Sequence, residues 1–282
     1  MEYTTIASLN YLDKLDLYEE EKPFVCTIAP WSIPGAKRNN LSLTAYDTIV
    51  TDMRLHLDEL STDVHGFSVT KSASKISHAN FGDDEYVREH YFSECVALLK
   101  SRFNAEKVHI FDHTVHQDPG KQLTGEEILR PAYDVHVDQT PASVRRRVES
   151  IFPEESAALL RGRVRILNLW RPLISPVRDH PIAVCDYRST SSIDYVPTDL
   201  PSPYWIGELF LLNYNPNHQW YFLKDMELDE VLVLKCFDSA AEQEGSRIAL
   251  CAPHTAFDWK DTPADATPRK SLEIRALVFS HS

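Results

Sequence analysis

The sequence lacks the short motifs that mark several large enzyme classes. It contains no glycine-rich phosphate loop, no G-x-S-x-G motif and no C-x-x-C pair, so nucleotide transfer, α/β-hydrolase chemistry and disulfide exchange are without the residues they require. With only 8 glycines among 282 residues, flexible glycine-rich linkers are not expected. Apolar runs of 18 residues are missing, and the N-terminal segment has no basic start followed by an apolar run. We therefore expect neither a transmembrane helix nor a signal peptide.

Basic residues are in the minority. The chain has 29 lysines and arginines against 42 aspartates and glutamates, which gives a formal net charge of −13. Because Lys and Arg provide most of the affinity for nucleic acids and anionic membranes, we expect neither as a partner. The five cysteines form no close pair, as is typical of reduced thiols inside cells. These features predict a cytoplasmic protein and leave its oligomeric state open.

The composition and patterning are those of a folded, strand-rich protein. Hydrophobic residues make up 43% of the chain, as in ordinary globular domains. Apolar spacing predicts a helix over residues 83–105, a strand over 107–115 and a short helix that begins at Thr124. From about residue 133, short runs rich in β-branched and aromatic residues alternate with turn formers. We expect an α+β, mainly β fold with helices flanking an antiparallel barrel-like core.

The simplest domain organisation is a single unit over residues 1–282. Residues 1–130 would form an N-terminal extension of helices and strands packed on the core. Residues 131–282 would form the β core that carries the functional site.

A histidine followed two residues later by an aspartate occurs at 56–58, 116–118 and 136–138. Side chains two residues apart share one face of a strand but diverge on a helix. The first pair lies in a segment with helical spacing, and the second runs into a Pro-Gly turn, so both are poor metal sites. The third pair, His136 and Asp138, lies in an extended segment that ends at Pro141. Both of its side chains could reach one metal ion.

Such a short pair needs a third ligand. His254 is the strongest candidate, because it ends an apolar run and shares the alternation of Leu250 and Ala252. On its own, a hydrogen-bonded structural histidine is the more common finding at such a position. Two histidines and one carboxylate would form the facial triad of non-haem Fe(II) oxygenases, which leaves positions open for O2 and a co-substrate.

Two arginines could bind an anion beside this centre. Arg275 lies in the middle of a predicted strand on the face opposite Ile274, and a buried guanidinium requires an anionic partner. That partner is either a salt bridge, with Glu273 as the candidate, or the distal carboxylate of 2-oxoglutarate, which a guanidinium binds through two hydrogen bonds. Arg269 lies closer to His254, in a predicted loop, and is the competing candidate.

Several long stretches resemble the hydroxylase/desaturase family that includes the aspergillic acid hydroxylase and the accessory protein of cephamycin methoxylation. They occur in order over about residues 66–279 and are far more specific than any His-x-Asp pair. The stretches are GFSVTKSASKI, FDHTV, VHVDQTPAS, RILNLWRP, PVRDHPIAVCDYRS, HQWYFLKDMELDEVLVLKCFDS, PHTAF and SLEIRALVF.

The resemblance implies a double-stranded β-helix, that is, a jelly-roll or cupin-like fold, which binds Fe(II) and uses 2-oxoglutarate and O2 as co-substrates. It would assign His136, Asp138 and His254 to the iron. Arg275 would anchor 2-oxoglutarate, with Arg269 as the alternative. A further residue of the family pattern, Asn168, would lie near the co-substrate.

The same resemblance marks candidate substrate contacts. Trp170 shares a strand face with Asn168, although a packed core tryptophan is the alternative interpretation. Arg171 would point the other way unless the strand ends early. Gln139 stands where we would expect an aromatic residue and His116 where we would expect an arginine, so substrate choice could differ from that of better-known members.

The implied function is an Fe(II)/2-oxoglutarate-dependent oxygenase. It would abstract hydrogen from a small amino-acid-derived or other secondary metabolite, giving hydroxylation, desaturation or oxidative ring closure. No residue beyond the metal ligands is assigned a catalytic role. One alternative is a non-catalytic accessory protein of the same fold that works with a partner enzyme. Another is a metal-dependent barrel enzyme that does not use 2-oxoglutarate, in which Arg275 is only structural.

Overall fold

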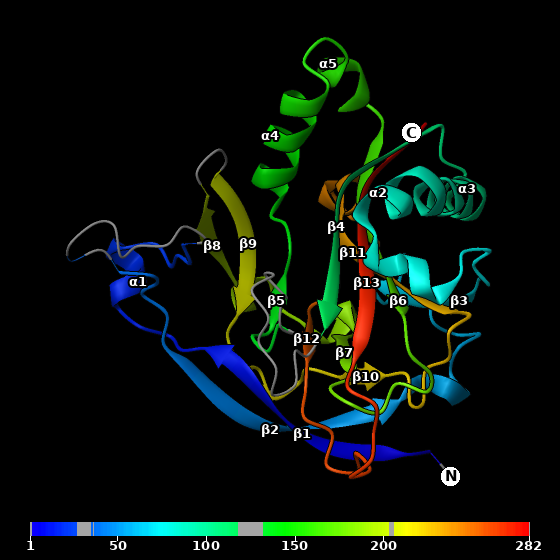
Figure 1. Ribbon diagram of the computed structural model, residues 1–282. Helices are drawn as coiled ribbons and strands as arrows, with labels where there is room; N and C mark the ends of the chain where they lie inside the picture. Colours follow the sequence, from blue (N-terminus) through cyan, green and yellow to red (C-terminus); the bar gives the residue numbers. More distant parts are fainter. Residues whose placement is uncertain (1, 27–34, 36, 118–131, 203–205, 282) are drawn as a thin grey trace.

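The computed structural model describes residues 2–26, 35, 37–117, 132–202 and 206–281. Their strands form two sheets with a shared core (Figure 1). The eight-stranded sheet has the order β1 (Thr4–Leu12), β2 (Leu43–Asp52), β10 (Trp220–Phe222), β7 (Ile182–Cys185), β12 (His254–Ala256), β5 (His136–Val137), β9 (Ile206–Leu212) and β8 (Tyr195–Pro201). The five-stranded sheet has the order β3 (Phe67–Lys71), β11 (Glu230–Asp238), β6 (Arg163–Pro172), β13 (Lys270–Ser280) and β4 (Lys107–Gln117).

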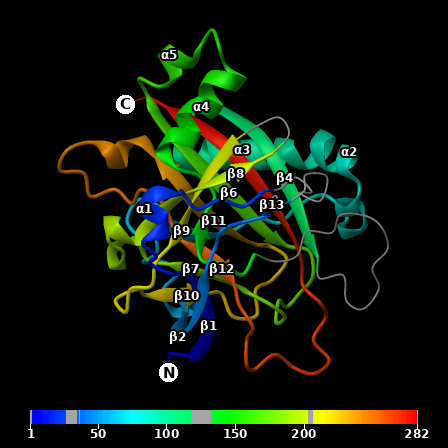
Figure 2. The same cartoon turned by 90° about the vertical axis from the view of Figure 1, so that its left-hand side faces the viewer.

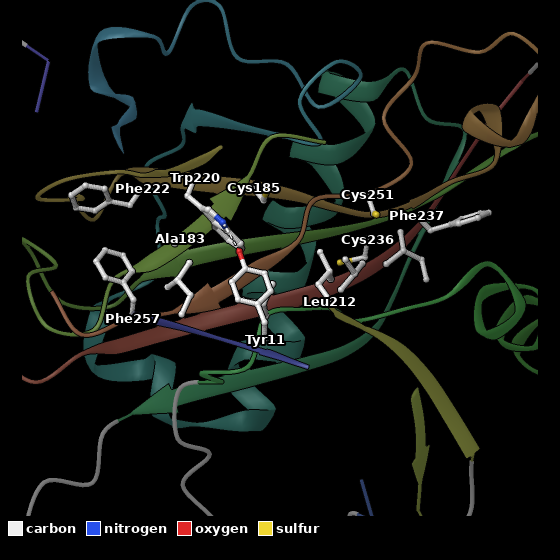
Figure 3. Close-up of a cluster of buried hydrophobic side chains, with 14 of the residues drawn as sticks. Tyr11, Ala183, Cys185, Leu212, Trp220, Phe222, Cys236, Phe237, Cys251 and Phe257 are labelled. Carbon is white, nitrogen blue, oxygen red and sulfur yellow. Dashed lines mark hydrogen bonds between the residues drawn. The ribbon is translucent and has the colours of Figure 1, made fainter. Parts of the chain in front are cut away.

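Apolar side chains from both sheets fill the space between them. Ile166, Phe237 and Leu277 come from the five-stranded sheet, and Leu212 and Trp220 come from the eight-stranded sheet. Figure 3 shows part of this cluster. Each buried side chain of this size contributes about 1.5–3 kcal/mol relative to an exposed one, so the two sheets hold each other in place.

Helices cover the outer face of the five-stranded sheet. The helical segment predicted over residues 83–105 is confirmed as α2 (Asp84–Tyr86), a π-helical turn (Val87–Tyr91) and α3 (Phe92–Phe103). Both views show β4 and β13 side by side (Figures 1 and 2). Leu99 of α3 belongs to the same apolar cluster as Leu169 and Ile274. Because strand residues alternate, Glu273 and Arg275 project from β13 toward the other sheet.

The remaining helices are short or lie at the ends of the sheets. α4 (Pro141–Ile151) is separated from the end of β5 by three residues, and Thr140 caps it through its side chain. The others are α1 (Leu17–Glu20), α5 (Ser156–Leu159) and 3-10 turns at Met53–Leu55, His78–Gly82, Tyr187–Ser189, Ser192–Asp194 and Ser239–Glu242.

The mainly β, α+β fold is confirmed, with two local corrections. The apolar run at residues 246–252 is not a strand, because its amides bond to scattered partners: Ala249 N–H donates to Asp63 and Ala252 N–H to Lys235. The helical spacing at residues 53–60 produces only the 3-10 turn at 53–55. The helix expected at Thr124 lies outside the described residues. The division at residue 131 stays a prediction, although β1 to β4 belong to the same two sheets as the later strands.

Candidate metal centre

Strands β5 and β12 bring the predicted histidines together. Their pairing places His136 opposite His254, and the ring centroids lie 4.4 Å apart. Asp138 follows β5 and places its Oδ1 3.4 Å from Nε2 of His136. One potential ligand atom from each of the three side chains lies within 4.8 Å of the other two. The three groups therefore converge on a single point between the sheets.

Backbone carbonyls orient both imidazoles. His136 Nδ1 donates to the carbonyl of Asp134 at 2.7 Å, and His254 Nδ1 donates to the carbonyl of Ala252 at 3.0 Å. Each ring then carries its hydrogen on Nδ1 and presents the lone pair of Nε2. Metal-binding histidines are commonly oriented in this way, so these residues fit a metal ion.

The Asp138 carboxylate is held through its second oxygen. Its Oδ2 accepts hydrogen bonds from Asn168 Nδ2 at 2.6 Å and from Arg275 Nε at 3.0 Å. Burial by itself would raise the pKa of Asp138, but the charge of Arg275 outweighs it and holds this pKa well below its usual value. Asp138 is therefore ionised at neutral pH, and its Oδ1 faces the histidines.

Arg275 is already surrounded by protein anions. Besides Asp138, its guanidinium donates to Glu273 and, through Nη1, to Asp112 at 3.0 Å and Thr114 at 2.9 Å. Burial opposes the charge of Arg275, but the three carboxylates raise its pKa well above the usual value. The pKa of Glu273 is lowered to about 2, because the charge of Arg275 outweighs the effect of burial. The salt bridge to Glu273 considered from the sequence is present.

Arg269 lacks such partners. The residue is only 3% exposed, its Nη1 donates to the carbonyl of His180 at 2.6 Å, and its Nε has no hydrogen-bond acceptor among the described residues. Its guanidinium lies 5.6 Å from the ring centroid of Trp170. Within the described parts of the chain, no carboxylate forms an ion pair with this guanidinium. Burial lowers the pKa of Arg269 to about 10, as expected for a cation without a neutralising anion.

Ser271 is a second buried group without a partner. The residue is fully buried, and its Oγ makes no hydrogen bond to any residue that the structure describes. By strand alternation it projects from the same face of β13 as Glu273 and Arg275. A buried polar group left unpaired costs about 1–3 kcal/mol, and such groups require an explanation. Ser271 and Arg269, two residues apart at the start of β13, leave donors available for an anion.

A cavity of about 50 Å³ lies beside the triad. Small-molecule sites usually enclose roughly 300 Å³ or more, so bound co-substrate and substrate would extend beyond it. Its walls are His116, Ala132, His136, Trp170, Ile182, His254, Thr255, Ala256, Arg269, Glu273 and Arg275.

Most residues predicted from the sequence reach this site. His116, Trp170, Arg269 and Arg275 line the cavity together with the two histidines, and Asn168 contacts Asp138 from the inner face of β6. Of the rejected pairs, His56 instead contacts Glu2 and Glu59 at the surface, and Asp118 lies outside the described residues. Sequence reasoning overlooked Ser271, which is not itself part of the cavity wall, although its spacing of four from Arg275 predicts a shared strand face.

One predicted substrate contact is corrected, and a second stays a prediction. Arg171 projects from the opposite face of β6, where its guanidinium donates to the Tyr91 hydroxyl and to the carbonyls of Ser72 and Leu228. The strand continues through Pro172, so alternation turns Arg171 away from the cavity. Gln139 accepts a hydrogen bond from Ser143 Oγ at 3.0 Å and lies outside the wall of the small cavity, so its substrate contact stays a prediction.

Two sheets enclosing a His-x-Asp and distal His triad define the class, a non-haem Fe(II)/2-oxoglutarate-dependent oxygenase with a double-stranded β-helix. The family model described as an oxidoreductase/YMDC permease-like domain matches residues 9–279, and the chain belongs to this family. Among the described residues, no helix has the length and apolar character needed to cross a membrane.

Curated and solved relatives agree with this class. The Fe(II)/2-oxoglutarate-dependent dioxygenase nvfI of Aspergillus novofumigatus is 30% identical over 257 residues, 87% of each chain. The hydroxylase/desaturase efuI of Hormonema carpetanum is 31% identical over 258 residues, 82% of each chain. A solved structure of the iron and α-ketoglutarate-dependent endoperoxidase NvfI superimposes with a TM-score of 0.86, at 27% identity and 99% coverage of both chains. The predicted fold and the hydroxylase/desaturase resemblance are confirmed.

Proposed function

We propose that His136, Asp138 and His254 hold the Fe(II), and that Arg269 and Ser271 anchor 2-oxoglutarate beside it. The observation that carries this proposal is the convergence of two free Nε2 atoms and one carboxylate oxygen next to buried donors that lack partners. Fe(II) held in such a triad supplies O2 activation coupled to decarboxylation of 2-oxoglutarate to succinate and carbon dioxide.

The choice of Arg269 over Arg275 follows from the charge around each guanidinium. Arg275 meets three carboxylates, so another anion would have to displace one of them. Arg269 forms no ion pair with a carboxylate of the described residues, and the more distant charges of Glu273 and Asp179 offset its burial only in part. A distal carboxylate that accepts from Arg269 Nε and Ser271 Oγ would satisfy both groups and neutralise the cation. Arg275, the preferred anchor from the sequence, thus becomes the alternative.

The substrate we propose is a small amino-acid-derived or other secondary metabolite, oxidised by hydroxylation, desaturation or ring closure. The relatives named as hydroxylase/desaturase and endoperoxidase support this range of oxidations. Trp170 and Ile182 give the cavity apolar walls, and His116 adds a buried Nδ1 without a hydrogen-bond partner. We propose that His116 Nδ1 contacts a polar group of the substrate.

The test begins with anaerobic addition of Fe(II) and 2-oxoglutarate to the metal-free protein. A weak visible charge-transfer band is expected, and His136→Ala should abolish it. In air, succinate release by the isolated chain separates an enzyme from an accessory protein that needs a partner. Absence of both the band and succinate in the wild type would contradict the proposal.

Titration of the same band with 2-oxoglutarate compares the two arginines at saturating Fe(II). Arg269→Lys keeps the positive charge but loses the planar guanidinium with its paired N–H donors. The Kd for 2-oxoglutarate should therefore rise about tenfold or more. Arg275→Lys should change this Kd by less than about threefold. Arg165→Lys is the matched control, because Arg165 is 3% exposed and lies outside the cavity wall. The reverse ranking of Arg269 and Arg275 would restore Arg275 as the anchor.

We also propose that the protein works in the cytoplasm. The five cysteines are all free thiols in the structure, which supports a reducing compartment. Fluorescence microscopy of the tagged chain in its native cells tests this, and an organellar or secreted signal would contradict it.

A further inference from the structure

We propose that Asn168, Glu273 and Arg275 are positioning residues that fix Asp138 as a one-oxygen metal ligand. Together with Asp138 they close a hydrogen-bonded ring, called here the carboxylate ring. This inference rests on the proposed metal triad and concerns the protein before 2-oxoglutarate binds.

Every member of the carboxylate ring bonds to two others. Asn168 Nδ2 donates to Asp138 Oδ2 at 2.6 Å and to Glu273 Oε1 at 2.9 Å. Arg275 donates through Nε to Asp138 Oδ2 at 3.0 Å and through Nη2 to Glu273 Oε2. Two carboxylates thus alternate with two donors, and neither carboxylate can rotate without breaking two hydrogen bonds.

Neighbouring strands of one sheet carry three of these side chains. Asn168 on β6 is the register partner of Arg275 on β13, and Glu273 lies two residues before Arg275 on the same strand face. Asn168 is fully buried and Glu273 is 4% exposed. Groups supplied by packed strands hold their positions better than groups on loops, so this sheet fixes the orientation of the loop residue Asp138.

The carboxylate ring determines which oxygen of Asp138 faces the metal. Both donors bond to Oδ2, and Oδ1 is the atom that lies 3.4 Å from His136 Nε2. With Oδ2 occupied, Asp138 offers one oxygen and leaves the remaining metal positions for other ligands. Glu273 lies outside the three-residue ligand cluster, so it acts through Arg275 and Asn168.

The orientation of Asn168 shows which interactions dominate. Within the described part of the chain its Oδ1 is buried without a hydrogen-bond partner, while Nδ2 donates to two carboxylates. A flipped amide would place Oδ1 against two negative charges. The two carboxylates therefore fix the amide, although one of its own polar atoms stays unsatisfied.

The test measures Co(II) binding to the metal-free protein by visible absorption, with no 2-oxoglutarate present. Glu273→Gln and Asn168→Ala should each raise the Kd for Co(II) about 10-fold or more, as loss of groups that orient metal ligands typically does. The Co(II) absorption spectrum should also change shape, because Asp138 can then bind through both oxygens. The double variant should lose less than the product of the two single losses, since either change opens the ring.

Two matched variants control for a general loss of structure. Glu230→Gln alters another buried, arginine-paired glutamate, and Asn213→Ala alters another buried asparagine. Neither position lines the cavity, so both should retain the wild-type Kd and spectrum. If Glu273→Gln fails to fold, Asn168→Ala still decides the question.

Three results separate the hypotheses. An unchanged Kd and spectrum in the folded ring variants would overturn the carboxylate ring, as would equal losses in the controls. If His136→Ala weakens Co(II) binding while the ring variants do not, only this inference fails. If His136→Ala also leaves Co(II) binding unchanged, the proposed metal triad fails and the carboxylate ring fails with it.

Discussion

At the residue scale, the two arginines of the cavity differ in how many hydrogen-bond acceptors surround their buried guanidinium groups. Arg275 and Arg269 have the same chemistry and both line the wall. Arg275 has four side-chain acceptors, three of them carboxylates. Arg269 has one backbone acceptor and an unpaired Nε. A buried cation binds an added anion best when protein carboxylates have not already neutralised it. The groups around each arginine therefore decide whether its guanidinium can bind a ligand.

Ser271 gives a prediction at the same scale. Ser271→Ala should raise the Kd for 2-oxoglutarate about 5-fold, the effect of one hydrogen bond of roughly 1 kcal/mol. The free energy of unfolding without ligand should stay within about 0.5 kcal/mol or rise, because the lost hydroxyl has no partner. Titration of the charge-transfer band and urea unfolding measure the two quantities. An unchanged Kd would remove Ser271 from the anion site.

At the element scale, Gly66 determines how the chain enters β3. Its φ is +90°, and a Cβ at this position would lie 2.5 Å from the carbonyl oxygen of Cys251. Its own carbonyl accepts from the Lys235 amide of β11 at 2.8 Å, so the backbone cannot shift freely. Gly66→Ala should lower the free energy of unfolding by about 3 kcal/mol.

Urea unfolding of Gly66→Ala beside Gly82→Ala checks this prediction. Gly82 has open space where a Cβ would stand, so its substitution should change stability by less than about 0.5 kcal/mol. Similar losses in both variants would show that the strained backbone of Gly66 is not the cause.

The start of β11 carries a pH-dependent contribution. Burial alone would raise the pKa of Glu230, but hydrogen bonds from Arg54 at 2.8 and 2.9 Å and from the Glu227 amide lower it below its usual value. A carboxylate with a lowered pKa stabilises the fold at pH above its unfolded value of about 4.3, and this contribution declines as the pH falls toward the folded pKa.

Glu230→Gln should therefore cost about 2 kcal/mol of unfolding free energy at pH 7. The difference from the wild type should shrink below about pH 4.3, because the wild type then begins to lose the same contribution. Urea unfolding at pH 7, 4.5 and 3.5 measures the difference. A constant difference over this range would contradict the assignment to the Glu230 carboxylate.

At the scale of the whole molecule, the proposed metal site joins the two sheets. His136 and His254 belong to the eight-stranded sheet, while Asn168 and Arg275, which hold Asp138, belong to the five-stranded sheet. A metal bound at the triad therefore stabilises the packing of one sheet on the other. The free energy of metal binding should therefore add to the free energy of global unfolding.

Mn(II) is a suitable probe because it does not require exclusion of air. At a concentration 100 times its Kd it should add about 2.7 kcal/mol to the unfolding free energy, or roughly 5–10 °C in Tm for a domain of this size. Chelation should reverse the shift, and His254→Ala should not show it. Calorimetry with and without chelator measures the change, and an equal shift in His254→Ala would place the metal elsewhere.

The sequence by itself determined the mainly β fold and the helix over residues 83–105, and it singled out His136, Asp138 and His254, which the structure brings together. These follow from local periodicity and from the resemblance to the hydroxylase/desaturase family over most of the chain. Both depend only on the order of the amino acids. Alternation also predicted that Asn168 and Trp170 share the inner face of β6 and that Arg171 points outward, which the structure shows.

Only the tertiary structure decided which arginine is available for an anion. The partners that occupy Arg275 come from β4, from the loop after β5 and from β13 itself, segments up to 163 residues apart in the chain. Arg269 is buried without such partners. Electrostatic neutralisation depends on distances in space, and sequence spacing does not report those distances until the sheets are assembled.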